Sequence, residues 1–216
     1  MTLEGHAGAV VLLHGLGRTR RSMEPIARAA RRRGYLAFNH GYPSRRMGVD
    51  ALAEEIRRAL WPALAALPGP VHFVTHSLGG LLVRAALAAE PLPTLGRVVM
   101  LCPPNVGSEV ADRLRGGRFY RWLTGPAGQE LGTDPAGAAA RLGPPAFEVG
   151  VIAGSRSVEP HLSRFIPGPN DGKVAVERAR LEGMRDFLVV ERSHPFVMRA
   201  PEVVDAVFRF LEQGEF

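Results

Sequence analysis

Short apolar segments alternate with helix-like segments along most of the chain, and this alternation constrains the fold more than any other feature. A strand that is buried on both faces reads as an uninterrupted apolar run, whereas an amphipathic helix repeats its apolar residues every three or four positions. We predict strands at 9–13, 35–39, 71–75, 97–102, 147–154 and 186–190, and helices at 22–33, 49–66, 78–90, 176–181 and 201–211. Because such alternation builds βαβ units, the sequence predicts an α/β fold: a single, mostly parallel sheet of about six strands with helices on both faces.

The composition limits the class of protein. The chain has 216 residues, a length typical of one domain with a sizeable core. Its single cysteine, Cys102, excludes an internal disulfide framework and a zinc site built on cysteines. No run of about 18 apolar residues is present, so we expect no transmembrane helix. Residues 1–8 lack the basic start and separate apolar stretch of a signal peptide, so we expect a cytoplasmic protein.

The charge is basic and comes almost entirely from arginine. The net charge is +6, and Lys173 is the only lysine among 27 basic residues. Such a surplus is typical either of GC-rich coding or of a protein with an anionic partner, such as nucleic acid, phospholipid headgroups or an acidic substrate. The arginines of residues 18–46 are not interleaved with aromatic residues as on a face that binds single strands, so we predict no nucleic-acid partner. Salt-dependent DNA binding would revive that alternative.

The most informative motif, Thr75-His76-Ser77-Leu78-Gly79, joins the third predicted strand to the following helix. A serine at such a junction lies on a tight turn with its hydroxyl exposed at the carboxyl end of the sheet, and Gly79 has no side chain to obstruct the turn. The backbone N–H of Leu78 lies in the first turn of the helix, where the helix dipole favours negative charge. The motif predicts Ser77 as a nucleophile and Leu78 as an oxyanion-hole donor. The alternative is a serine that only caps the helix.

A second glycine-rich motif, HGLG at 14–17, follows the first predicted strand. In hydrolases whose nucleophile follows a strand in this way, the loop after the earlier strand supplies the second oxyanion-hole N–H, which makes the backbone of Leu16 the candidate donor. The alternative is a dinucleotide-binding loop that begins with the same G-x-G. Arg20 replaces the third glycine of that pattern, and the next strand ends at Asn39 rather than at an acidic residue, so we do not favour it.

A nucleophilic serine needs a general base and an acid that orients the base. Two histidines, His161 and His194, follow Ser77 in the chain, and the usual order in this topology is serine, then acid, then histidine. His194 follows the last predicted strand and is the predicted base. Asp171, in the sequence PNDG at 169–172, precedes it and is the predicted acid. The alternative is that this segment forms only a turn.

The chain resembles small bacterial α/β hydrolases of the lipase and esterase type. The resemblance rests on HGLG at 14–17, THSLGG at 75–80, CPPNVGSE at 102–109, PNDGKVAV at 169–176 and SHPF at 193–196. It implies the α/β-hydrolase fold in one domain of residues 1–216, and a triad of Ser77, Asp171 and His194. Such a triad cleaves carboxylic esters through an acyl-enzyme, as a carboxylesterase or small lipase with no cofactor and no metal. The alternatives are a thioesterase or an acyltransferase with the same triad, or a binding protein without turnover. Thr75 departs from the family pattern, which usually has glycine there.

The resemblance also implies a cap over the active site, in the glycine-rich insertion at 105–145 where the alternation of strands and helices breaks. Leu114, Phe119 and Trp122 in this insertion are candidates for binding substrate or for touching a lipid surface. The alternative is that they only pack the insertion onto the sheet. The expected partner is therefore a small-molecule ester. A lipid substrate taken from a lipid interface is the alternative.

Overall fold

Six strands form one parallel sheet in the computed structural model, which describes residues 7–216. They are β1 (Ala9–Leu13), β2 (Leu36–His40), β3 (Val71–His76), β4 (Leu95–Leu101), β5 (Val149–Gly154) and β6 (Asp186–Val190). Their order is β2-β1-β3-β4-β5-β6, and every neighbouring pair is parallel. The predicted α/β class and the predicted number of strands are confirmed. Residues 1–6, on which part of the signal-peptide prediction rests, lie outside the described residues.

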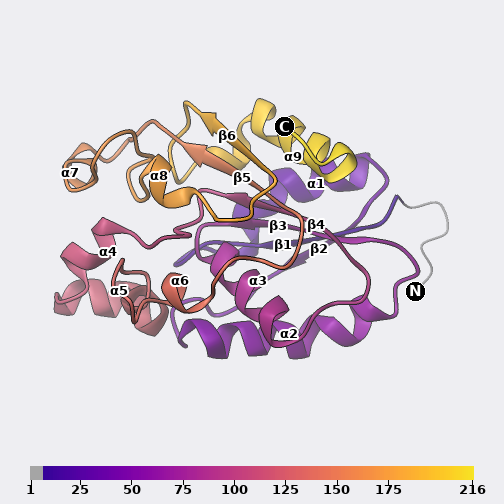
Figure 1. The fold of residues 1–216 in the computed structure, drawn as a ribbon, viewed down its shortest axis with the longest axis horizontal. Helices are drawn as coiled ribbons and strands as arrows, with labels where there is room; N and C mark the ends of the chain where they lie inside the picture. The colour runs from indigo at the N-terminus through magenta and orange to yellow at the C-terminus, as the bar shows by residue number, and fades with distance from the viewer. Residues whose placement is uncertain (1–6) are drawn as a thin grey trace.

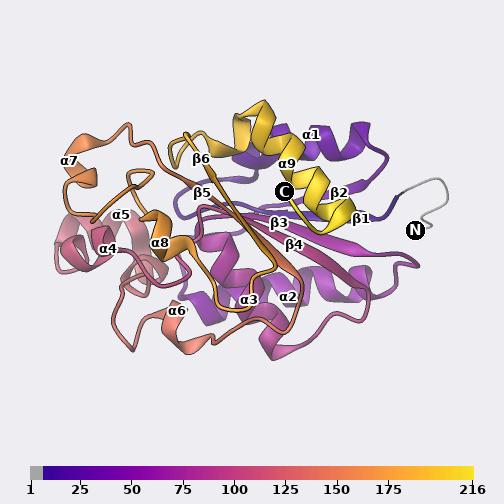
Figure 2. The same cartoon turned by 45° about the horizontal axis from the view of Figure 1, so that its top comes forward.

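The helices cover both faces of the sheet (Figure 1). They are α1 (Glu24–Arg32), α2 (Val49–Ala65), α3 (Leu78–Ala89), α4 (Glu109–Leu114), α5 (Arg118–Gln129), α6 (Ala138–Arg141), α7 (Pro160–Ser163), α8 (Val176–Ala179) and α9 (Pro201–Gln213), with short 3-10 turns η1 (Arg20–Met23) and η2 (Val197–Arg199). The turned view shows α1 and α9 together on one face and α2 with α3 on the other (Figure 2). No helix in the described part of the chain is both long and apolar enough to cross a membrane.

The apolar runs in the sequence follow from this double cover. All five residues of β1 are buried, and their side chains alternate between two cores. Val10 and Leu12 pack with the apolar residues of α1 and α9, whereas Val11 and Leu13 pack with those of α2 and α3. Because water reaches neither face, no polar residue interrupts the run.

The direction in which successive strands are added reverses at β1. β2 is added on one side of β1, and β3 is added on the other. At this point the loops after β1 and β3 diverge to opposite faces and leave a crevice at the carboxyl ends of the strands. Leu13 pairs with Thr75, so the two loops leave the sheet at the same level. The predicted nucleophile and the HGLG loop are thereby adjacent.

The insertion at 105–145 is more ordered than we predict from the sequence, because it contains α4, α5 and α6. A kink conceals α5 in the sequence. Gly125 takes a positive φ of 65° in its middle, so that two short helical segments meet there. The large apolar side chains of α5, Phe119 and Trp122, are mostly exposed rather than part of the core.

Candidate active site

Ser77 lies on a strained turn between β3 and α3. Its backbone has φ 53° and ψ −121°, a conformation that residues other than glycine rarely adopt. The turn is held because the N–H of Ser77 donates a hydrogen bond of 2.9 Å to the carbonyl of Leu101 at the end of β4. Gly79 is needed two residues later, since a Cβ there would come within 2.7 Å of the Leu13 carbonyl oxygen. This is the geometry of a nucleophile elbow.

The HGLG loop packs directly onto this elbow. A Cβ on Gly15 would lie 2.7 Å from Nδ1 of His76 and 3.1 Å from Cβ of Ser77. Only glycine therefore allows the two segments to approach this closely. The loop after β1 and the predicted nucleophile form a single wall as a result.

Two backbone N–H groups remain available beside Ser77. The N–H of Gly17 already donates to Oγ of Ser44 at 3.0 Å. The N–H groups of Leu16 and Leu78 have no acceptor within residues 7–216. Leu78 is also the first residue of α3, where the helix dipole is positive. Both predicted oxyanion-hole donors therefore have an N–H group without a backbone acceptor in the described residues.

Two stacked rings, those of His14 and Tyr42, hold the HGLG loop, and the sequence did not indicate this contact. The rings of His14 and Tyr42 stack with centroids 4.1 Å apart, and the Tyr42 hydroxyl donates to the carbonyl oxygen of His14. Nδ1 of His14 donates to the carbonyl oxygen of Gly15 at 2.9 Å. Burial lowers the pKa of His14, so its ring is neutral at neutral pH. Tyr42 follows β2 in an ordinary Gly-Tyr-Pro turn, and no local pattern announces its role.

Asp171 and His194 form a buried pair at the same edge of the sheet. Nδ1 of His194 lies 2.7 Å from Oδ2 of Asp171, and the backbone N–H of His194 donates to the carbonyl oxygen of Asp171 at 3.1 Å. The other carboxylate oxygen accepts the backbone N–H groups of Lys173 (2.9 Å) and Val174 (2.8 Å). Burial alone would raise the pKa of Asp171, but the charge of His194 and these hydrogen bonds hold it below its usual value. Asp171 is therefore ionised at neutral pH.

His76 supports the loop that carries His194. Its Nε2 lies 3.0 Å from the carbonyl oxygen of His194, and the two ring centroids are 4.8 Å apart. Burial lowers the pKa of His76 well below its usual value, so the ring is neutral. Because a carbonyl oxygen can only accept, the proton of this neutral ring is on Nε2. His72, four residues earlier on β3, accepts the backbone N–H of Arg97 on its Nδ1 at 2.9 Å, and burial lowers its pKa to about 4.

Cys102 is the third potential metal ligand near the pair. Ligand atoms of Cys102, Asp171 and His194 lie within 4.8 Å of one another. Burial and the charge of Asp171 raise the pKa of the Cys102 thiol well above its usual value, which disfavours the thiolate that a metal would need. Both oxygens of Asp171 are already engaged in hydrogen bonds. The donor set therefore fits a buried, neutral thiol better than a metal centre.

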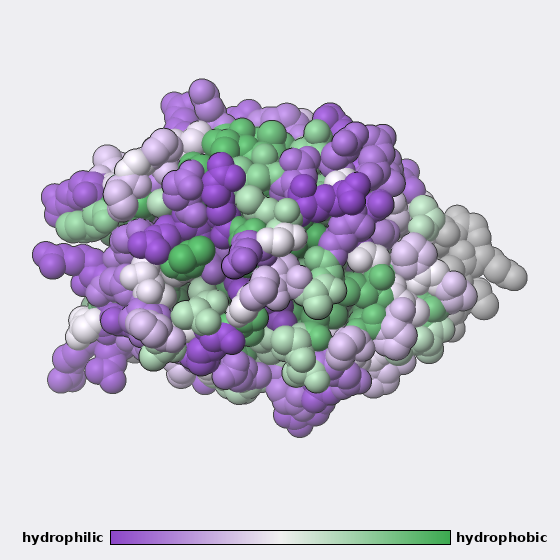
Figure 3. Space-filling model, in the orientation of Figure 1, coloured by the Kyte–Doolittle hydropathy of each residue, from purple (hydrophilic) through white to green (hydrophobic). Residues whose placement is uncertain are grey.

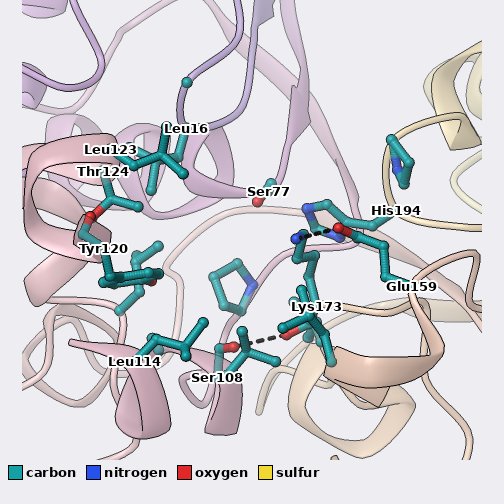
Figure 4. Close-up of a pocket in the computed structure, with 18 of the residues that line it drawn as sticks. Leu16, Ser77, Ser108, Leu114, Tyr120, Leu123, Thr124, Glu159, Lys173 and His194 are labelled. Carbon is teal, nitrogen blue, oxygen red and sulfur yellow. Dashed lines mark hydrogen bonds and ion pairs between the residues drawn. The ribbon is translucent and has the colours of Figure 1, made fainter. Parts of the chain in front are cut away.

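A cavity of about 740 Å³ opens in front of Ser77 and His194. Figure 4 shows Tyr120, Leu123 and Thr124 of α5 on the wall across from Ser77. Most of the lining is apolar, from the HGLG loop, α4, α5 and the loops after β5: Leu16, Val110, Ala111, Leu114, Phe119, Tyr120, Leu123, Leu131, Leu162 and Val174. The volume and lining are typical of a small-molecule site.

Two of the three substrate-binding candidates line this cavity, and the third does not. Leu114 and Phe119 belong to the lining. Trp122 lies outside the lining, and 75% of its surface is exposed. His161, which we did not favour as the base, is exposed on α7.

Charged residues also border the cavity. Arg18 and Arg45 line it, as do Glu159 and Lys173, which pair at 2.8 Å (Figure 4). Arg18 donates to the carbonyl oxygen of Pro195 at 3.0 Å and so ties the HGLG loop to the residue after His194. The arginines of residues 18–46 indicated a basic region early in the chain, but the sequence alone did not say which of them face the cavity.

The chain belongs to the Alpha/beta hydrolase family, whose sequence model matches residues 10–208. The match includes the elbow, the HGLG loop, Asp171 and His194. Among curated proteins, none matches this sequence significantly.

Solved structures with the same fold include lipases and esterases. A Bacillus licheniformis lipase in its mature form is 21% identical, with 94% of this chain and 91% of that chain covered and a TM-score of 0.74. A metagenomic carboxyl esterase is also 21% identical, with 96% and 76% covered and a TM-score of 0.73. A Legionella pneumophila phospholipase is 17% identical, with 95% of this chain but 59% of that chain covered and a TM-score of 0.73. At such identities the likeness establishes the fold.

Proposed function

We propose that this protein is a serine hydrolase that cleaves carboxylic esters, as a carboxylesterase or small lipase. The observation that carries the proposal is the hydrogen-bonded pair of His194 and Asp171 beside a strained Ser77, at the wall of an apolar cavity. A neutral imidazole oriented by a buried carboxylate is the base that a serine hydroxyl requires. No redox or metal step is needed for this chemistry.

The proposed reaction is a two-step acyl transfer. Asp171 accepts a hydrogen bond from Nδ1–H of His194, which keeps the proton on Nδ1 and leaves Nε2 free to take the proton of Ser77 as its oxygen attacks the ester carbonyl. The N–H groups of Leu16 and Leu78 donate to the oxyanion that develops. His194 then protonates the leaving alcohol, and afterwards it activates the water that releases the acid from Ser77.

We also propose that residues 1–216 act as one domain, with residues 105–145 as a cap over the site. Helices α4 and α5 of this segment contribute Val110, Leu114, Phe119 and Leu123 to the cavity wall. An acyl chain held among these side chains is shielded from water, and each buried CH₂ contributes about 0.8 kcal/mol. The substrate is therefore an ester with an apolar acyl group.

The test is hydrolysis of a p-nitrophenyl ester series from acetate to palmitate. We expect kcat/KM to rise from acetate to medium-length acyl chains and to vanish in Ser77→Ala. Ser155→Ala is the matched control, because its hydroxyl only donates to the carbonyl oxygen of Val190 at 3.2 Å. Release of free acid in the presence of added alcohols distinguishes a hydrolase from an acyltransferase, which would give mostly exchanged ester. Turnover that survives Ser77→Ala would overturn the proposal.

A further inference from the structure

One side of α5, at the rim of the cavity, presents large apolar side chains to solvent. Phe119 is 72% exposed, Trp122 is 75% exposed and Leu123 is 44% exposed. They are spaced at i, i+3 and i+4, so they share one side of the helix, and the rings of Phe119 and Trp122 are 5.9 Å apart. Exposed aromatic side chains that cluster in this way mark an interaction surface.

The same surface is positively charged. Arg118 and Arg121 are exposed on α5, between its apolar residues. Arg45 lies alongside, since a Cβ on Gly125 of α5 would overlap the carbonyl oxygen of Arg45. In the described part of the chain none of these three arginines forms a salt bridge. Figure 3 shows that hydrophilic residues cover much of this face, including the end of the molecule that carries α4, α5 and α7.

The arginines of α5 differ in this respect from the arginines of α2. On α2, Arg57 and Arg58 both pair with Glu54 on the same helix. The guanidinium groups of α5 are therefore free to meet anionic groups from outside the protein. Arginine matches the geometry of a phosphate with two parallel hydrogen bonds.

This surface borders the mouth of the cavity. Phe119, Leu123 and Arg45 line the cavity together with Ser77 and His194. A layer of lipid in contact with α5 therefore has a direct path to the nucleophile. The apolar chain of a lipid would pass from one apolar environment to another.

We infer that α5 docks the protein onto an anionic lipid surface. The docking surface consists of Arg118, Phe119, Arg121, Trp122 and Leu123. The aromatic side chains enter the boundary between headgroups and acyl chains, and the arginines bind phosphates of the headgroups. Docking itself does not depend on the proposed function. Its consequence does: a membrane ester would enter the cavity without crossing water.

The test measures binding of the Ser77→Ala chain to vesicles, so that lipid turnover does not interfere. Vesicles of phosphatidylcholine alone are compared with vesicles that also contain phosphatidylglycerol, by co-sedimentation at low and high NaCl. We expect tighter binding to the anionic vesicles and a loss at high salt. Arg118→Gln with Arg121→Gln should weaken binding about 30-fold, from about 1 kcal/mol for each arginine near the surface. Phe119→Ser with Trp122→Ser should weaken it at least about tenfold.

The matched control is Arg28→Gln with Arg32→Gln. These two arginines are exposed on α1, without a salt bridge in the described residues, and their loss changes the net charge equally. A loss of binding as large as that of the α5 pair would overturn the inference, because binding would then follow net charge alone. Equal binding to both vesicle types would also overturn it.

Fluorescence gives a second readout. Brominated lipids should quench Trp122 but leave Trp61, which is 4% exposed within α2, unquenched. An unquenched Trp122, or a Trp122-dependent dimer that forms without lipid, would overturn the inference. Hydrolysis of soluble p-nitrophenyl butyrate by the wild-type chain tests the proposed function separately: its loss alone leaves docking intact, and loss of vesicle binding alone leaves hydrolysis intact.

Discussion

Replacement of the buried carboxylate by an amide, Asp171→Asn, tests the arrangement of the site most informatively. Oδ1 of Asp171 accepts hydrogen bonds from the backbone N–H groups of Lys173 and Val174. Oδ2 accepts a hydrogen bond from Nδ1–H of His194. An asparagine has one oxygen and one NH₂ group. Its oxygen must face the two backbone donors, because the opposite orientation would bring three donors together.

The NH₂ group then faces His194 and needs an acceptor there. The imidazole meets this need by moving its proton from Nδ1 to Nε2, and Nε2 can no longer take the proton of Ser77. Because the wrong tautomer dominates, we expect kcat to fall about 10⁴-fold, the size of effect known for this substitution in a serine protease triad. This equals about 5 kcal/mol of transition-state stabilisation.

The assay is steady-state hydrolysis of a soluble p-nitrophenyl ester, with thermal unfolding of each variant. Asp205→Asn is the control, because Asp205 pairs with Arg33 on the surface, where a salt bridge contributes about 1 kcal/mol or less. The reasoning is refuted by a folded Asp171→Asn enzyme that keeps kcat within about tenfold of the wild type.

Three further predictions concern buried polar groups. Burial and the charge of Arg97 lower the pKa of His72 to about 4 in the fold from 6.5, so its stabilising contribution is complete above pH 6.5 and is lost as the pH falls toward 4. Between about pH 7 and about pH 5, urea unfolding should show a loss of about 2 kcal/mol that His72→Gln lacks; equal losses would contradict this. Arg84 is buried and donates to Asn105 and Gly143, near the two ends of the insertion, so Arg84→Met should lower the free energy of unfolding by about 2 kcal/mol and speed proteolysis within 105–145. Unchanged denaturation midpoints would argue against this tie. Oγ1 of Thr75 is buried without a partner in the described chain, so Thr75→Val should raise the free energy of unfolding by about 1 kcal/mol, and a decrease would show that the hydroxyl is satisfied.

The strands could be predicted from sequence because burial on both faces leaves an unmistakable apolar run, as in β1. The edge of the sheet at which Ser77, Asp171 and His194 gather could also be predicted, since each follows a strand and parallel strands end at one edge. Their distances could not. The contact of 2.7 Å between His194 and Asp171 depends on the paths of two long loops.

The helices within residues 105–145 and the tertiary contacts of several buried side chains could not be predicted, for physical reasons. Gly125, at φ 65°, divides α5 into two short segments, and neither is long enough to show a sustained helical period in the sequence. The role of Arg84 depends on contacts 21 and 59 residues away in the chain, beyond any local pattern. The pairing of His14 with Tyr42 is likewise a product of the tertiary fold.

The most direct test of the central claim is the site of covalent labelling by a fluorophosphonate. Such a probe reacts with a serine only when a base and an oxyanion hole are assembled around it. We predict a single adduct on Ser77, located by mass spectrometry in the wild-type protein and absent in Ser77→Ala. A folded protein that is not labelled, or is labelled at another residue, would contradict the proposed active site.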